Sequence, residues 1–236
     1  MNLILLRPAD FVREGRAVLK DRRLAHAREV LRAAIGDALT VGIEGGAIGR
    51  ATVVALSDTA IELEVQVGEP PPPPLDVLLA VALPRPPTLR KVLQQATALG
   101  VKRFVFFRAE RVERSYFTSH ALREAAIDED LRLGLEQARD TVMPTVEVRP
   151  EAFSWFVRTR WPGLAEGRRV LVAHPGGSVP CPCGQVGPAA LVIGPEGGFI
   201  PAEVEALAAG GAVIDLGARI LRVETAVVAL LARLMG

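Results

Sequence analysis

Five consecutive prolines, Pro70 to Pro74, follow Glu69 and separate two stretches of chain with different patterns. Proline has a fixed φ angle and no backbone N–H, so a run of five forms neither a helix nor a central strand. Such a run favours a stiff, extended connector. We therefore predict a small domain over residues 1–69, a linker over 70–74 and a larger domain over 75–236.

The small domain has the pattern of short strands. Apolar and polar residues alternate between Thr59 and Val67, which predicts a strand with one buried face. Residues 38–43 and 48–56 predict two more strands, joined by a turn at Gly45-Gly46. A short helix is expected at residues 22–31. These elements predict a small β-barrel or sandwich.

Beyond the prolines, short apolar runs alternate with segments of helical spacing. Residues 77–83 form a continuous apolar run, which is typical of a strand buried on both faces. Further strands are expected at residues 103–107, 170–173, 189–193 and 213–216, and helices at 89–99, 122–139, 201–209 and 223–235. This alternation predicts an α/β fold with a mostly parallel sheet. The last helix is apolar on nearly all sides, so we expect it to be buried.

Composition narrows the class of protein. Half of the 236 residues are hydrophobic and 23% are charged, which is typical of a folded globular chain. Two cysteines are too few for a disulfide scaffold and fit a reducing compartment. The apolar run Leu3–Leu6 is too short for a membrane span and lacks a basic segment before it. We expect a cytoplasmic protein without a signal peptide.

The net charge of +1 conceals uneven zones. Residues 1–32 carry eight basic and four acidic side chains, and residues 85–117 carry eight basic and two acidic ones. Residues 33–84 carry one basic side chain against seven acidic ones. One interpretation is a surface for a polyanion such as RNA. The other is a set of ordinary solvated faces.

Three expected strands run directly into glycine turns. The turns are His174-Pro-Gly-Gly177, Gly194-Pro-Glu-Gly-Gly198 and Leu216-Gly217. Glycine lets a ligand approach the backbone closely, and open α/β sheets bind ligands beyond the carboxyl ends of their strands. We expect the three turns to converge and to hold a ligand mainly through backbone groups. The alternative is three tight turns without a ligand.

Other kinds of site find less support. The glycine turns match neither a dinucleotide fingerprint nor a phosphate-binding P-loop. Cys181 and Cys183 with His174 do not supply the ligands of a structural zinc site, so we expect no metal. Arg222 precedes the last helix, where it would stabilise negative charge in a substrate or pair with a nearby carboxylate.

Two motifs near the C-terminus resemble a known family. They are Gly194-Pro-Glu-Gly-Gly198 and Leu216-Gly-x-Arg-Ile-Leu-Arg-x-Glu-Thr225. With upstream matches at His26, Gly100 and Pro144, they resemble the RsmE family over nearly the whole chain. Members of this family are methyltransferases of the SPOUT superfamily that modify uridine N3 in 16S ribosomal RNA.

The resemblance implies a PUA-like RNA-binding barrel at the N-terminus and a trefoil-knotted α/β domain at the C-terminus. It also implies a homodimer that binds S-adenosylmethionine among the knot loops and acts on 16S ribosomal RNA or the small ribosomal subunit. Carried over by position, the cofactor-binding residues are Ala173, His174, Pro175, Gly194, Pro195, Glu196, Gly197, Gly198, Phe199, Leu216, Gly217, Ile220, Leu221 and Arg222.

The resemblance also assigns catalytic and RNA-binding residues. Arg222 and Glu224 are expected beside the methyl donor. RNA contacts are expected from Arg7, His26, Arg32, Arg108, Arg111 and Arg114. The chain departs from the usual family pattern at Gln95, Ala98 and Ala138-Arg139-Asp140, on the expected RNA or substrate surfaces.

Those departures keep a second function open, that of a non-catalytic RNA-binding or ribosome-assembly paralogue with the same fold. A third hypothesis is another small-molecule α/β enzyme with an appended barrel. It predicts that the protein does not bind RNA at low salt.

Overall fold

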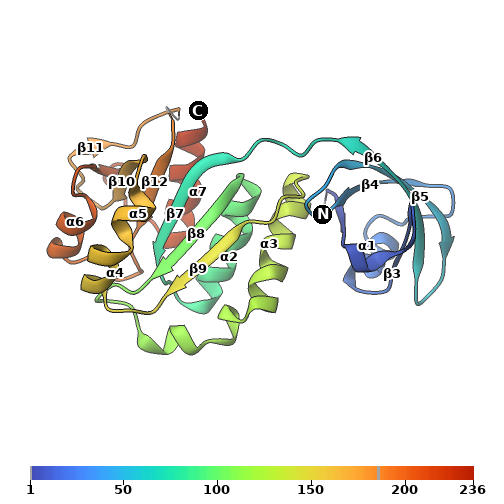
Figure 1. Ribbon diagram of the computed structural model, residues 1–236, viewed down its shortest axis with the longest axis horizontal. Coiled ribbons are helices and arrows are strands. Elements are labelled where there is room, and N and C mark those ends of the chain that lie inside the picture. The colour runs from blue at the N-terminus through green and yellow to red at the C-terminus, as the bar shows by residue number, and fades with distance from the viewer. Residues whose placement is uncertain (1, 185–186) are drawn as a thin grey trace. The chain divides into compact units, whose positions relative to one another are not determined.

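The computed structural model describes residues 2–184 and 187–236, and its backbone divides into two compact units (Figure 1). The first unit comprises Met1–Pro73 with Arg132–Met143, and the second comprises Pro74–Leu131 with Pro144–Gly236. Residues 70–74 lie between two strands and belong to neither helix nor strand.

The first unit is built on a six-stranded sheet that curls into a half-barrel. Its strand order is β1-β4-β5-β6-β3-β2, in which β1 and β4 are parallel and the other neighbours are antiparallel. The elements are β1 (Ile4–Leu6), η1 (Pro8–Asp10), β2 (Phe11–Arg13), β3 (Arg16–Leu19), α1 (Arg22–Glu29), β4 (Ala38–Ile43), β5 (Ile48–Leu56) and β6 (Ile61–Glu69). The expected half-buried strand is confirmed, because Ile61 and Leu63 of β6 are fully buried while Glu64 and Gln66 are exposed.

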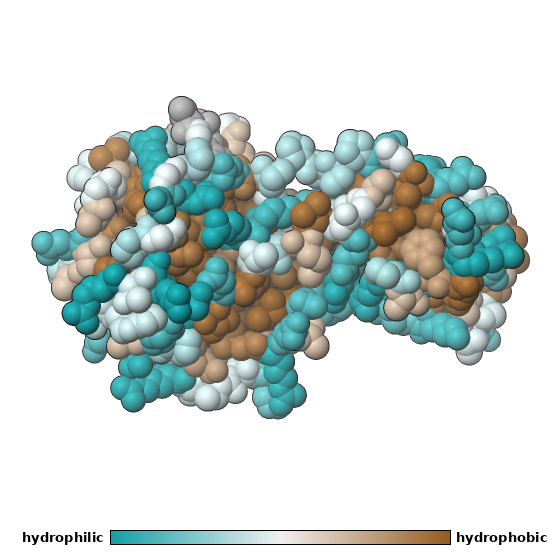
Figure 2. Space-filling view, viewed as in Figure 1, coloured by the Kyte–Doolittle hydropathy of each residue, from teal (hydrophilic) through white to brown (hydrophobic). Residues whose placement is uncertain are grey.

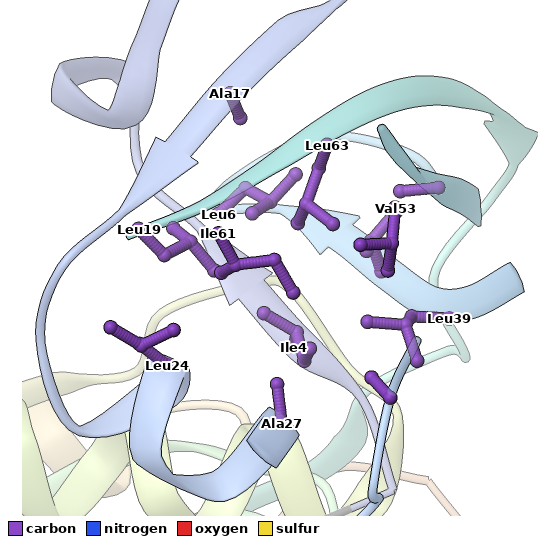
Figure 3. Close-up of a cluster of buried hydrophobic side chains, with 13 residues drawn as sticks. Ile4, Leu6, Ala17, Leu19, Leu24, Ala27, Leu39, Val53, Ile61 and Leu63 are labelled. Atoms are coloured by element: carbon purple, nitrogen blue, oxygen red, sulfur yellow. The ribbon is translucent and has the colours of Figure 1, made fainter. Parts of the chain in front are cut away.

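Helix α1 packs its apolar face on the hollow of this sheet. Figure 3 shows Leu24 and Ala27 of α1 pointing toward Leu19, Ile61 and Ile4. The helix begins after Asp21, whose carboxylate accepts a hydrogen bond from the backbone N–H of Arg23. It ends at Glu29, two residues earlier than the sequence predicts.

Strand β1 is buried on both faces. Ile4 and Leu6 point into the core that α1 covers, while Leu3 and Leu5 pack with Ile48 and with Leu135 near the end of α3 (Glu124–Ala138). The segment Arg132–Met143 therefore belongs to the core of the first unit. Asp140 ends this segment's helix with a turn, since its carboxylate accepts hydrogen bonds from the N–H groups of Thr141 and Val142 at 2.7 and 3.0 Å.

The second unit contains a seven-stranded parallel sheet in the order β11-β13-β10-β12-β7-β8-β9. The strands are β7 (Leu75–Ala82), β8 (Val101–Phe107), β9 (Thr145–Arg149), β10 (Arg169–Ala173), β11 (Val179–Pro180), β12 (Ala189–Ile193) and β13 (Ala212–Asp215). Residues 77–83 are all buried, as the continuous apolar run predicts.

Helices cover this sheet and extend its loops. They are α2 (Pro86–Ala98), the 3-10 turns η2 (Arg114–Thr118) and η3 (His120–Leu122), the first part of α3, α4 (Phe153–Thr159), α5 (Trp161–Ala165), α6 (Pro201–Leu207) and α7 (Val223–Met235). Gly100 ends α2 with a φ of +86°, which glycine adopts without strain. The expected start of α3 at residue 122 is wrong, because residues 120–122 form a separate 3-10 turn.

Both the α/β class and the added N-terminal β-sheet are confirmed. The trefoil knot that the resemblance implies stays a prediction. Among the described residues, no helix has the length and apolar character of a membrane span.

Candidate active site

Three neighbouring parallel strands end beside one another in the second unit. Strands β13, β10 and β12 are consecutive in the sheet, and they end at Asp215, Ala173 and Ile193. Because the strands are parallel, the glycine turns that follow them lie at one edge of the sheet. The backbone N–H of His174 donates to the carbonyl of Ile214 at 3.0 Å, which joins the first turn to strand β13.

The three turns enclose a cavity of about 360 Å³, a size that suits a small ligand. Every cofactor-binding residue expected from the sequence lines it, except Arg222. The other lining residues are Arg111, Ile193, Ile214, Asp215, Arg219, Val223, Ala226 and Leu230. The structure thus brings together segments that lie more than forty positions apart in the sequence.

Local geometry favours glycine at several points of the cavity wall. A Cβ atom at Gly194 would lie 3.2 Å from the ring of Phe199, and one at Gly197 would lie 3.3 Å from the side chain of Arg111. Gly198 and Gly217 have φ angles of +71° and +101°, in the region that favours glycine. The wall is therefore formed largely by backbone, as a cradle for a ligand would be.

An aromatic stack fixes the side of the cavity formed by Phe199. The ring of Phe199 lies 6.2 Å from that of Phe107 at the end of β8, and Phe107 lies 4.8 Å from Phe156 of α4. All three rings are buried. The stack gives this side of the cavity an apolar boundary next to the charged groups of the turns.

Charged groups reach the cavity from several loops. The Arg111 guanidinium donates to the carbonyl of Gly197 at 2.6 Å. The Glu196 carboxylate accepts from the backbone N–H of Arg85 at 3.2 Å, and the Asp215 carboxylate accepts from the N–H of Gly217 at 3.2 Å. The cavity therefore offers carboxylates, the guanidinium groups of Arg111 and Arg219, and the His174 imidazole to a ligand that carries both signs of charge.

The two expected catalytic residues lie at the start of α7 and do not line the cavity. Arg222 is the N-cap residue of α7 and is exposed, and it is flanked in sequence by the lining residues Leu221 and Val223. Glu224 is buried and pairs with Lys91 at 3.2 Å. A hydrogen bond from its own backbone N–H, together with Lys91, lowers the pKa of Glu224, which makes it a weaker base.

The expected RNA-binding residues differ in exposure. In the first unit Arg32 is exposed, whereas Arg7 and His26 are half-buried. In the second unit Arg111 and Arg114 are exposed and Arg108 is half-buried. Arg111 is the one member of this set that lines the cavity.

Three charged residues that line the cavity, Arg111, Asp215 and Arg219, were not among the expected cofactor-binding residues, although Arg111 was expected to contact RNA. Arg111 has no local motif and reaches the cavity only because β8 ends near it in the folded sheet. Asp215 does have a signal, since it directly precedes the Leu216-Gly217 turn at the end of a strand. Within residues 2–184 and 187–236, no group of three or more His, Cys, Asp or Glu side chains is arranged to hold a metal ion.

Comparisons with known proteins bear on the site. A family model described as an RNA methyltransferase domain matches residues 71–235. Ribosomal RNA small subunit methyltransferase E from Treponema pallidum is 29% identical over 96% of this chain and 87% of its own length. The RsmE resemblance is thereby confirmed.

Solved structures share the fold of the whole chain. A putative methyltransferase from Legionella pneumophila, solved with its cofactor SAM, matches with a TM-score of 0.71 at 23% identity, covering 98% of this chain and 95% of that one. Ribosomal RNA small subunit methyltransferase E from Neisseria gonorrhoeae, bound to S-adenosyl methionine, has a TM-score of 0.71 at 21% identity, covering 98% and 96%. The glycine cradle lies inside the region that the family model matches, and the chain belongs to the RNA methyltransferase family.

Proposed function

We propose that the chain methylates N3 of a specific uridine in 16S ribosomal RNA of the small subunit, with S-adenosylmethionine as the methyl donor. One observation carries the proposal: the turns after β10, β12 and β13 meet in a cavity whose wall is largely glycine backbone. The names of the relatives and the cofactor bound in the two similar structures support it.

The residues present fit the donor. S-adenosylmethionine supplies an electrophilic methyl group on a positively charged sulfur when it is bound. Any side chain at Gly194 or Gly197 would press on Phe199 or Arg111. Glycine at these positions leaves room in the cavity for an adenosine-sized group. Ile193, Leu216 and Leu230 offer apolar contacts, and the carboxylates of Glu196 and Asp215 offer partners for an amino group or hydroxyls.

The uridine must be activated before it attacks, because its N3 atom carries a proton. Negative charge then develops on the ring oxygens, and a guanidinium placed beside them stabilises it. Arg222 is exposed at the edge of the cavity wall and takes this role in the proposal. The lowered pKa of Glu224 and its pairing with Lys91 favour a different proton acceptor, either water or a cavity carboxylate.

RNA binding is proposed for basic residues of both units. The half-barrel over residues 1–69 is the proposed PUA-like RNA-binding domain, and Arg32 and Arg114 offer exposed cations to phosphates. Base chemistry at N3 requires an edge that pairing would hide, so the target uridine is unpaired or flipped out. Affinity for RNA should fall as salt rises.

A homodimer in the cytoplasm completes the proposal. Apolar surface remains open on the second unit, as the brown areas in Figure 2 show. At the cavity itself, Ile220 is 85% exposed and the neighbouring Leu221 is also exposed. Large apolar side chains left open beside a binding site are typical of a surface that a partner covers.

The alternative, a non-catalytic paralogue, rests on the departures at Gln95, Ala98 and Asp140. Asp140 is 2% exposed and holds the turn after α3 through two backbone N–H groups. Its presence is thus explained by local structure and does not indicate a lost activity. Gln95 is exposed on α2, where a change would alter RNA contacts before it altered the cavity.

The test has two parts. Calorimetric titration of the purified protein with S-adenosylmethionine and S-adenosylhomocysteine should show saturable binding. Small subunits from a strain that lacks this gene should then accept labelled methyl groups, and mapping should locate them at N3 of one uridine. Binding of RNA without methyl incorporation would favour the paralogue, and the absence of cofactor binding would contradict the proposed enzyme.

A further inference from the structure

Glu203, on α6, is a buried carboxylate that does not line the cavity. It is 2% exposed. One carboxylate oxygen accepts a hydrogen bond from the backbone N–H of Glu110 at 2.7 Å, and the other accepts from the backbone N–H of Ile200 at 3.0 Å. The side chain therefore joins the loop after β8 to the loop after β12.

The joined residues stand next to the cavity wall. Glu110 precedes Arg111, whose guanidinium donates to the Gly197 carbonyl at 2.6 Å. The Arg111 side chain also lies against Gly197, because a Cβ atom added there would meet its Cβ and Cδ atoms at 3.3 Å. Arg111 and the 194–200 loop are thus fixed to each other at two places, the Gly197 carbonyl and the Glu203 carboxylate.

We propose that Glu203 is a positioning residue for the cofactor cavity and acts through Arg111. The inference rests on the proposed function, since it takes S-adenosylmethionine as the occupant. Hydrogen bonds to a buried carboxylate are among the stronger ones in proteins, and a buried charge without its donors is costly. The carboxylate therefore holds the backbone at Glu110 in place, and that backbone sets where the Arg111 guanidinium closes the wall.

Helix α6 begins at Pro201, so Glu203 also caps its first turn through Ile200. If Glu203 only capped the helix, its substitution would lower the stability of the protein. Its effect on cofactor affinity would then not depend on Arg111. The two roles are separated by a double-mutant cycle on cofactor affinity. If the two residues act together, the double variant binds the cofactor no more weakly than either single variant. If they act independently, the two increases in Kd multiply.

Glu203→Gln is the first variant. Its amide NH₂ group would face a backbone N–H donor, so one of the two hydrogen bonds is lost while the shape is kept. We expect the Kd for S-adenosylhomocysteine to rise about tenfold, with a similar rise for Arg111→Met and for the double variant. The KM for the methyl donor should rise, while kcat at saturating donor stays within about twofold.

Glu205→Gln is the matched control, because Glu205 is an exposed carboxylate on the same helix. It should leave the Kd unchanged. A double variant of Glu203→Gln and Arg111→Met that is about a hundredfold weaker would overturn the proposal. So would a Glu203→Gln variant with unchanged affinity.

Hydrogen exchange gives a readout that does not depend on the cofactor. In Glu203→Gln, the amide of Glu110 should exchange at least about tenfold faster, and the amides of β12 should not change. Unaltered exchange at Glu110 would contradict the positioning role. If the wild-type protein binds no cofactor but Glu110 is protected by Glu203, the proposed function fails instead, and the two failures are distinguished.

Discussion

Two regions of this molecule treat charge in opposite ways. In the first unit, the guanidinium of Arg23 is 2% exposed and donates to Asp10, to Asp21 and to the carbonyl of Leu5, at distances between 2.6 and 3.2 Å. At the cavity of the second unit, Glu196, Asp215 and His174 each expose part of their surface toward the hollow. The first set of charges is satisfied internally, and the second remains available to a ligand.

The difference teaches how to separate structural from functional charge in one chain. Side chains surround Arg23, and its partners come from three short elements that it holds together. Backbone surrounds the cavity, and its glycines keep side chains out. Removing a group from the Arg23 cluster should therefore lower the free energy of unfolding without changing ligand affinity. A substitution in the cavity wall should change ligand affinity with little effect on the free energy of unfolding.

The largest expected effect is on stability, from Arg23→Met. It leaves the carboxylate of Asp10, which is 12% exposed, without its main partner, and breaking a buried ion pair typically costs about 3–5 kcal/mol. Urea unfolding should show this loss, while the Kd for S-adenosylhomocysteine stays unchanged under native conditions. Arg28→Met is the control, since its pair with Asp58 is exposed and should contribute less than about 1 kcal/mol. Equal losses in both variants would refute the contrast.

Arg222→Ala should act on turnover alone. Loss of a group that stabilises developing charge typically lowers kcat by about 10²–10³, which is about 2.7–4 kcal/mol. Cofactor affinity and the urea midpoint should not move, because the side chain is exposed and lies outside the cavity lining. The measurement is methyl incorporation into small subunits under single-turnover conditions. Retained turnover would show that Arg222 has been misassigned.

Gly197→Val should weaken cofactor binding. A branched side chain would press on Arg111, which already lies 3.3 Å from the position of the added Cβ. We expect the Kd for S-adenosylhomocysteine to rise at least about tenfold, which corresponds to about 1.4 kcal/mol of binding free energy. The free energy of unfolding should change little. Gly163→Val is the control, because nothing lies within 4 Å of a Cβ at that position. Unchanged affinity in Gly197→Val would contradict the backbone cradle.

The smallest expected effect is the loss of stability at low pH that depends on Asp21. Burial acts to raise the pKa of Asp21, but hydrogen bonds from the Arg23 side chain and backbone lower it from 3.8 to about 2. A depressed pKa contributes stability above the unfolded value, and that stability is lost as pH falls from about 5 toward 2. Because the side chain is 43% exposed, we expect only about 1 kcal/mol.

Asp21→Asn provides the measurement. The wild-type protein should be the more stable at pH 6, and the gap in free energy of unfolding should narrow by pH 3. Asp58→Asn, at a carboxylate that is 90% exposed, should show no such narrowing. If the difference in free energy of unfolding between the two proteins is constant from pH 6 to pH 3, Asp21 does not contribute to the pH dependence of stability.

Much of the parallel sheet could be predicted from sequence, because several of its strands are apolar runs and three of them lead into glycine turns. The strands at 189–193 and 48–56 have the expected bounds. Strand β9 was missed because its alternation of polar and apolar residues spans only five positions, and none of these residues is fully buried. Strands β1 to β3 are three or four residues long, too short for periodicity to identify.

The cavity was predictable where it is made of local turns and not where it depends on packing. In each of the three turns, which contain His174, Gly194 and Leu216, an expected strand leads into glycine, and this pattern is visible in the sequence. Arg111 and Glu203 become neighbours only through the order of strands β12, β7 and β8. The burial of Glu224 likewise depends on α2 and Lys91, which no motif near residue 224 could indicate.

Strand β1 has a consequence for synthesis of the chain. Leu3 and Leu5 pack with Leu135, so one apolar face of β1 is covered only by a residue 130 positions further along the chain than Leu5. A nascent chain released or stalled before residue 135 would keep one apolar face of β1 open. That open face is a site where a chaperone would bind until residue 135 has been translated.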